Sequence, residues 1–135
     1  MQSATASSYE RNLIHDCSPI SAIDGNIETR WASDWKDDVN ITFALGEERD
    51  VLGIDLLWEN GWSNEYDILV SSDSINWEVA QHFNGSQMDI YEIDGMHCTT
   101  INFTPVTGKY ILIKGIKRNQ SYGYSLYEIQ IICNK

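Results

Sequence analysis

Two oxygen-rich segments stand out in this sequence: Ala22-Ile23-Asp24-Gly25-Asn26-Ile27-Glu28-Thr29-Arg30-Trp31 and, about a hundred residues later, Ser125-Leu126-Tyr127-Glu128. The first segment places the hard oxygen donors of three side chains around a glycine, which tolerates a positive φ. Glu128 offers a second carboxylate from the far end of the chain. The pattern predicts a fold whose ends meet around a calcium ion, with ligands from Asp24, Asn26, Thr29 and Glu128.

An EF-hand is the competing calcium motif, and the spacing excludes it. Its loop needs Gly at the sixth position and Glu at the twelfth, where this chain has Thr29 and Trp35. A second alternative needs no metal: Asp24 would cap a turn and Glu128 would pair with Arg30.

The chain is 135 residues long, and we expect residues 1–135 to form one domain. Apolar residues occur in short runs separated by Gly, Asn, Asp and Ser, and no segment has the pattern of a long amphipathic helix. Such spacing predicts an all-β, antiparallel sandwich or barrel. The expected strands are Val39–Leu45, Val51–Trp58, Tyr66–Ser71, Trp77–Phe83, Thr99–Phe103, Lys109–Lys117 and Ser125–Cys133, with weaker candidates at Ser3–Ser8 and Asp89–Ile93.

Within the expected strand Lys109–Lys117, alternation places Ile111 and Ile113 on the core face and Tyr110 and Leu112 on the other face. Three tryptophans lie inside the apolar pattern and are assigned to the core: Trp31, Trp58 and Trp77. Asp73-Ser74-Ile75-Asn76 has the composition of a turn.

The charge distribution restricts the partners. The formal net charge is −11, and no Lys or Arg occurs between Asp50 and Gly108. Such a field repels phosphate polyanions and anionic lipids, so it disfavours nucleic acid and membrane binding and favours neutral or cationic partners. No run approaches the ~18 apolar residues that span a bilayer, and Met1–Glu10 lacks the pattern of a secretion signal.

The three cysteines, Cys17, Cys98 and Cys133, cannot all pair within one chain. One disulfide with one free thiol, or three reduced thiols, both agree with the sequence. The Cys and His spacing does not match a zinc site.

The order of several short motifs identifies a family resemblance. The motifs are Ala22-Ile23-Asp24-Gly25-Asn26, Thr29-Arg30-Trp31, Phe43-Ala44-Leu45-Gly46, Trp58-Glu59, Tyr66-Asp67-Ile68-Leu69-Val70-Ser71-Ser72-Asp73, Asn76-Trp77, Tyr110-Ile111-Leu112-Ile113 and Tyr124-Ser125-Leu126-Tyr127-Glu128-Ile129. In this order they resemble a discoidin domain, also called the coagulation factor V/VIII C-type domain, whose bacterial branch is the family 32 carbohydrate-binding modules. The resemblance implies an eight-stranded jelly-roll sandwich that binds ligand through loops at one end and has no catalytic centre. It also implies a structural calcium ion at the predicted site of Asp24, Asn26, Thr29 and Glu128.

A sugar site combines a flat aromatic face with directed polar groups, and three segments carry that mixture: residues 34–38, 59–65 and 119–124. The resemblance places the family's binding loops there. The candidate carbohydrate-binding residues are Asp34, Trp35, Glu59, Trp62, Asn64 and Tyr122, and His15 would join them. Alternative roles remain open: Trp35 packing over its own loop, Trp62 covering the edge of Tyr66, Asn64 capping its loop, Tyr122 on the sandwich rim and His15 on the surface.

Glu59 restricts the class of sugar that the domain is expected to bind. Galactose-binding members of the family often carry arginine near this point, whereas this chain has Trp58-Glu59. A carboxylate beside exposed aromatic rings suits hydroxyl groups or the ammonium of a glucosamine unit. Arg30 is expected to pair or pack near the predicted calcium site rather than to touch the ligand.

These observations favour a non-catalytic, lectin-like module that binds a neutral or amino-sugar glycan and belongs to a larger, secreted multimodular protein or an oligomer. The alternative is a protein-interaction or adhesion domain without sugar binding. Catalysis is disfavoured: Glu59 with Glu65, or Asp37 with Asp38, would need a defined separation across a cleft, and the familiar catalytic motifs are absent from the sequence.

Overall fold

The computed structural model of the chain describes residues 2–10, 17–84, 91–93 and 96–134, without the side chains of residues 91–93. The elements are β1 (Ser3–Ala6), a 3₁₀-helix η1 (Pro19–Ala22), β2 (Trp31–Ala32), β3 (Asn40–Trp58), β4 (Ser63–Ser71), β5 (Glu78–Asn84), β6 (Tyr91–Ile93), β7 (Met96–Arg118) and β8 (Ser125–Cys133). The expected all-β, antiparallel architecture is confirmed: within the described residues, eight strands pair, all of them antiparallel.

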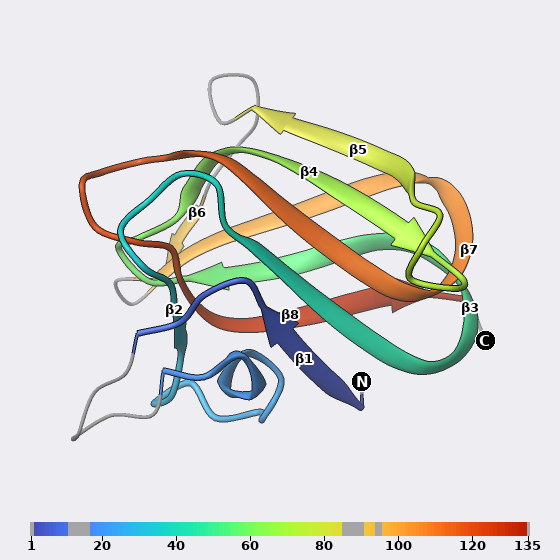
Figure 1. Ribbon diagram of the computed structural model, residues 1–135, viewed down its shortest axis with the longest axis horizontal. Coiled ribbons are helices and arrows are strands. Elements are labelled where there is room, and N and C mark those ends of the chain that lie inside the picture. Colours follow the sequence, from blue (N-terminus) through green and yellow to red (C-terminus); the bar gives the residue numbers. More distant parts are fainter. Residues whose placement is uncertain (1, 11–16, 85–90, 94–95, 135) are drawn as a thin grey trace.

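Two long strands, β3 and β7, pass through both layers of the sandwich, and both turn back at the right-hand side of Figure 1. The first half of β3 pairs with β1 and with the second half of β7, which also pairs with β4. The second half of β3 pairs with β8 and with the first half of β7, which also pairs with β6. Register shifts between Ala44 and Arg49, and between Val51 and Gly53, mark the bend of β3.

This continuity corrects two of the expected boundaries. The sequence separated Val39–Leu45 from Val51–Trp58, and Thr99–Phe103 from Lys109–Lys117, because polar or turn-forming residues interrupt each pair. In the structure each pair is one continuous, bent strand, and the pairing of β3 with β7 shifts register at the interruptions. The two-residue strand β2 and the helix η1 were not expected, since neither is long enough to show a periodicity.

The core lies between the two layers. Ile111 and Ile113 point into it, as their alternation predicts, and Trp31 and Trp58 are buried there. Trp77 was also assigned to the core, and that assignment is wrong: its side chain is only half-buried, in the turn between β4 and β5.

The turn at residues 73–76 is confirmed, and Asp73 organises it. One carboxylate oxygen accepts the backbone N–H groups of Ile75 and Asn76, at 2.9 and 2.8 Å, and also contacts the Ser71 hydroxyl. These bonds hold the pKa of Asp73 well below its usual range. The turn closes the β4–β5 hairpin at the end of the sandwich remote from residues 59–62.

Each of the three cysteines is a thiol rather than part of a disulfide; Cys17 is buried, and Cys98 and Cys133 are half-buried. Among the described residues, no helix is long and apolar enough to cross a membrane.

A charged cluster adds to the backbone pairing between the outer strand β5 and β4. The His82 ring lies between two carboxylates of β4, with Nδ1 2.6 Å from Asp67 Oδ1 and Nε2 3.2 Å from Glu65 Oε2. The hydrogen bond to Asp67, followed by the negative charges of Asp67 and Glu65, raises the pKa of His82.

Replacing His82 with glutamine therefore changes the pH dependence of stability. Because the pKa of the folded state lies above that of the unfolded chain, the protonated ring stabilises the fold at pH below about 6.5, and this contribution is lost as the pH rises through the folded pKa. We expect the melting temperature of His82→Gln to fall below that of wild type at pH 5 and to approach it at pH 9, measured by thermal denaturation. An equal difference at both pH values would contradict this role.

Candidate functional site

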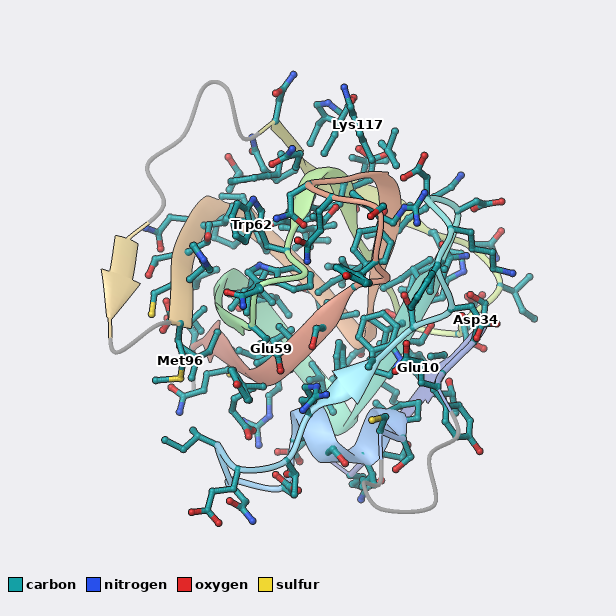
Figure 2. The ribbon with its side chains drawn as sticks, turned by 90° about the vertical axis from the view of Figure 1, so that its left-hand side faces the viewer. Glu10, Asp34, Glu59, Trp62, Met96 and Lys117 are labelled. Atoms are coloured by element: carbon teal, nitrogen blue, oxygen red, sulfur yellow. The ribbon has the colours of Figure 1, made fainter. Side chains whose placement is uncertain are left out.

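One end of the sandwich carries an open pocket of about 380 Å³. It is lined by residues from β2 and the chain before it, from the β2–β3, β3–β4 and β7–β8 loops, and from the start of β8: Glu10, Arg30, Ala32, Ser33, Trp35, Glu59, Asn60, Gly61, Gln120, Tyr122, Gly123, Tyr124 and Ser125. Figure 2 looks onto this end: Glu59 lies near the middle, Glu10 and Asp34 to its right and Trp62 above it. Residues far apart in the sequence thus form one surface.

The floor of the pocket is built by backbone pairing between the loops. Ser33 N–H donates to Tyr124 O at 2.8 Å, Ser125 N–H to Gly61 O at 2.7 Å and Glu59 N–H to Ser125 O at 2.9 Å. These contacts leave no room for a side chain at two glycines. A Cβ on Gly61 would lie 2.3 Å from Gly123 O, and a Cβ on Gly123 would lie 2.3 Å from Ser33 O.

An aromatic pair forms one wall. The rings of Trp35 and Tyr122 meet edge to face, with centroids 5.1 Å apart and an interplanar angle of 86°. Both remain largely in solvent, with 62% of Trp35 and 56% of Tyr122 exposed. Large apolar surfaces held in the open at a pocket mouth are suited to stacking on a ligand rather than to the core.

Two carboxylates with different partners face the pocket. Glu59 Oε2 lies 2.9 Å from Arg30 Nε, so this charge is neutralised by an ion pair. Glu10 Oε1 accepts the indole N–H of Trp35 at 2.9 Å. Within the described residues Glu10 has no ion-pair partner, in contrast to Glu59.

The structure brings three of the residues singled out from the sequence, Trp35, Glu59 and Tyr122, into this pocket. Asp34 is exposed beside it but does not line it. His15 lies outside the described residues.

Trp62 and Asn64 also lie outside the lining. The Trp62 indole N–H donates to Asn64 Oδ1 at 3.0 Å, and the Trp62 ring packs on His97 with centroids 3.8 Å apart. The Trp62 side chain is half-buried against the core, so it anchors the 59–65 loop to the sandwich. It packs on His97 rather than on the edge of Tyr66, the alternative that the sequence suggested.

Among the lining residues with charged or amide side chains, sequence reasoning missed four: Glu10, Arg30, Asn60 and Gln120. Asn60 and Gln120 belong to the expected loops, and the Gln120 side chain donates to Asn60 O at 3.0 Å. Arg30 was expected to pair or pack near the predicted calcium site, whereas in the structure its side chain forms an ion pair with Glu59. For Glu10 the sequence carries no signal, since only the fold brings the chain after β1 beside Trp35.

The oxygen-rich segment forms a compact loop next to β8. Asp24 accepts the Asn26 N–H at 2.9 Å and the Thr29 hydroxyl, and the Gly25 N–H donates to Glu128 Oε2 at 3.1 Å. Burial and the nearby Asp24 charge raise the pKa of Glu128. The predicted meeting of the two ends of the chain is confirmed. The described residues contain no group of three or more His, Cys, Asp or Glu side chains arranged to hold a metal ion.

The sequence matches the F5/8 type C domain family over residues 3–129, nearly its whole length. The chain is an F5/8 type C domain. The predicted resemblance to discoidin domains is therefore confirmed, and the pocket described above lies on this domain's loops. A comparison with curated proteins found no match.

Several solved structures similar to this F5/8 type C domain are, or contain, carbohydrate-binding modules. Chitosan-binding module 1 of a chitosanase/glucanase from Paenibacillus sp. IK-5 is 35% identical, with a TM-score of 0.78 over 96% of this chain and 93% of that chain. Module 2 of the same enzyme, in complex with chitotriose, is 29% identical, with a TM-score of 0.79 over 96% and 94%. The family 32 module in truncated AlyQ, which also has an alginate lyase domain, is 25% identical, with a TM-score of 0.76 over 99% of this chain and 32% of that chain.

Adding one methyl group at Gly123 tests the close approach of the loops. The new Cβ would meet the Ser33 and Asp34 carbonyl oxygens at 2.3 and 2.7 Å, and both are backbone atoms that cannot turn aside. We expect Gly123→Ala to lower the free energy of unfolding by about 1–3 kcal/mol, as overpacking does, measured by chemical denaturation. Ser121→Ala, at an exposed position of the same loop, is the control; equal stability of the two variants would show that the loops are not tightly apposed.

Proposed function

We propose that this F5/8 type C domain is a non-catalytic carbohydrate-binding module whose pocket binds a glycan containing glucosamine. The observation that carries the proposal is the meeting of an exposed aromatic pair, Trp35 and Tyr122, with the carboxylates of Glu10 and Glu59 in one open pocket. An aromatic face receives the apolar side of a pyranose, and carboxylates bind its hydroxyl or ammonium groups.

The two carboxylates have different roles in this proposal. Glu59 is already neutralised by Arg30, and the ion pair presents both an acceptor and donors to sugar hydroxyl groups. Glu10 lacks such a partner among the described residues and lies against the Trp35 indole. An ammonium group placed there would donate a charge-assisted hydrogen bond to the Glu10 carboxylate and make a cation–π contact with Trp35.

The charge of the whole domain supports a cationic ligand. With a net charge of −11, the protein attracts a polycation at long range and repels polyanionic glycans. The similar modules from Paenibacillus sp. IK-5 are chitosan-binding, which agrees with an amino-sugar ligand. The open shape of the pocket favours modest affinity for one sugar chain, so we place the domain in a larger extracellular protein or an oligomer, where avidity adds to it.

Titration with a glucosamine trimer and with its N-acetylated counterpart tests the proposal. We expect the wild type to prefer the glucosamine trimer and to lose affinity as salt screens the charges. Glu10→Gln should weaken binding of the glucosamine trimer roughly tenfold, with little change for the acetylated trimer, and Trp35→Ala should weaken both.

Glu47→Gln is the matched control, because it removes one exposed carboxylate at the bend of β3, away from the pocket. Equal affinity of the wild type for the two trimers would refute the amino-sugar assignment. Absence of binding to any glycan on an array, together with capture of a defined protein partner, would favour the adhesion alternative.

We also propose that the loop of Asp24, Asn26 and Thr29 holds a structural calcium ion together with Glu128. The donor set fits this hard cation, since it comprises two carboxylates, a hydroxyl and amide or carbonyl oxygens. The raised pKa of Glu128, which burial and the charge of Asp24 cause, marks a position where a cation would relieve an electrostatic cost. A bound ion would tie the loop before β2 to β8.

Calcium should therefore stabilise the fold by mass action. We expect added Ca²⁺ to raise the melting temperature of the chelator-treated protein by several degrees, and Asp24→Asn to abolish the increase. Asp38→Asn removes a carboxylate elsewhere and should retain it. A melting temperature that responds to neither Ca²⁺ nor chelator would overturn the proposal.

A further inference from the structure

Arg118, the last residue of β7, joins the two loops that carry the aromatic pair, although neither it nor its partner Asp37 lines the pocket. Its backbone N–H and its Nε both donate to Asp37 Oδ1, at 3.0 and 2.8 Å. Asp37 follows Trp35 by two residues. The same guanidinium reaches the other loop through Nη1, which donates to Ser121 O at 3.0 Å and contacts Tyr122 O at 3.4 Å.

The surroundings make this bridge well defined. The Arg118 side chain is 20% exposed, so most of it is shielded from solvent. Its hydrogen bonds hold the pKa of Asp37 below the usual range, and the carboxylate therefore stays charged. The Tyr124 hydroxyl donates to the Asp37 carbonyl at 2.7 Å, which fixes the backbone on which the carboxylate stands.

The aromatic pair needs such a support. The backbone bonds of the pocket floor join Ser33 to Tyr124, but Trp35 and Tyr122 lie beyond them, on the exposed rims of their loops. Two loose aromatic side chains would lose conformational freedom when a sugar stacked on them, and this loss would weaken binding. A bridge that orders both rims beforehand removes part of that cost.

We propose that Arg118 and Asp37 are positioning residues of the sugar site: their ion pair holds the Trp35 and Tyr122 loops at the spacing that a pyranose requires, without touching the ligand. The inference rests on the proposed function for its effect on affinity. Its effect on the aromatic pair is independent of any ligand.

Arg118→Met removes the guanidinium but keeps the length of the side chain. We expect its affinity for the glucosamine trimer to fall about tenfold and the resonance of the Trp35 indole N–H to move towards the free-tryptophan position. That resonance is assigned by its loss in Trp35→Phe. Arg49→Met is the matched control, since it breaks the Arg49–Glu47 ion pair, with its 2.6 Å contact, at the bend of β3; it should change neither affinity nor resonance.

Two further variants separate positioning from a general loss of stability. Arg118→Lys keeps the charge, but one ammonium cannot reproduce the planar fork that reaches both loops, so we expect a partial loss. Asp37→Ala removes the carboxylate at an exposed position and leaves the Asp37 carbonyl in place. The double variant with Arg118→Met should bind no more weakly than the weaker single variant, because both changes remove the same bridge.

The outcomes distinguish this inference from the proposed function. If the wild type binds the trimer, Trp35→Ala does not, and Arg118→Met leaves both affinity and resonance unchanged, the positioning role is wrong while the sugar site stands. If the wild type does not bind the trimer, the proposed function fails, and the Trp35 resonance alone decides: a shift in Arg118→Met supports the bridge, and an unchanged resonance overturns it.

Discussion

The antiparallel pairing of β3 with β7 is the constraint on which the other elements depend. Each strand contributes one half to each layer, so a single register between them positions both layers at once. The partners β1, β4, β6 and β8 then add to one strand or the other. Because the two strands bend together, the apolar faces of both halves turn towards the same core, and hydrophobic burial stabilises the bend.

The same pairing creates the site. Strand β3 ends at Trp58 and β7 ends at Arg118, both at the end of the sandwich where β8 begins, so the loops that follow them are neighbours. The floor and the rim of the pocket are held in different ways. Backbone hydrogen bonds and the glycines at 61 and 123 pack the pocket floor closely, whereas exposed side chains and one ion pair hold its rim. Binding sites commonly combine a rigid scaffold with such loops.

The local sequence pattern correctly predicted several features of this domain. Alternation identified the core face at Ile111 and Ile113, and the position of Trp35 among charges indicated an exposed ring. The local sequence pattern gave wrong predictions for side chains whose surroundings are set by residues far away in the sequence. Trp77 has the sequence surroundings of a core residue but sits in a turn at the sandwich edge, and Trp62 looks like a binding residue but packs on His97.

The sequence by itself determined the all-β class, because this follows from residue types and short-range spacing, and the order of its motifs along the chain indicated the family and the meeting of its two oxygen-rich segments. Only the tertiary structure decided which charges face one another: that Arg30 neutralises Glu59, that Glu10 lies against Trp35, and that Arg118 spans two loops. The physical reason is distance along the chain. Periodicity and turn chemistry act over a few residues, whereas an ion pair depends on the relative placement of strands that the whole core sets.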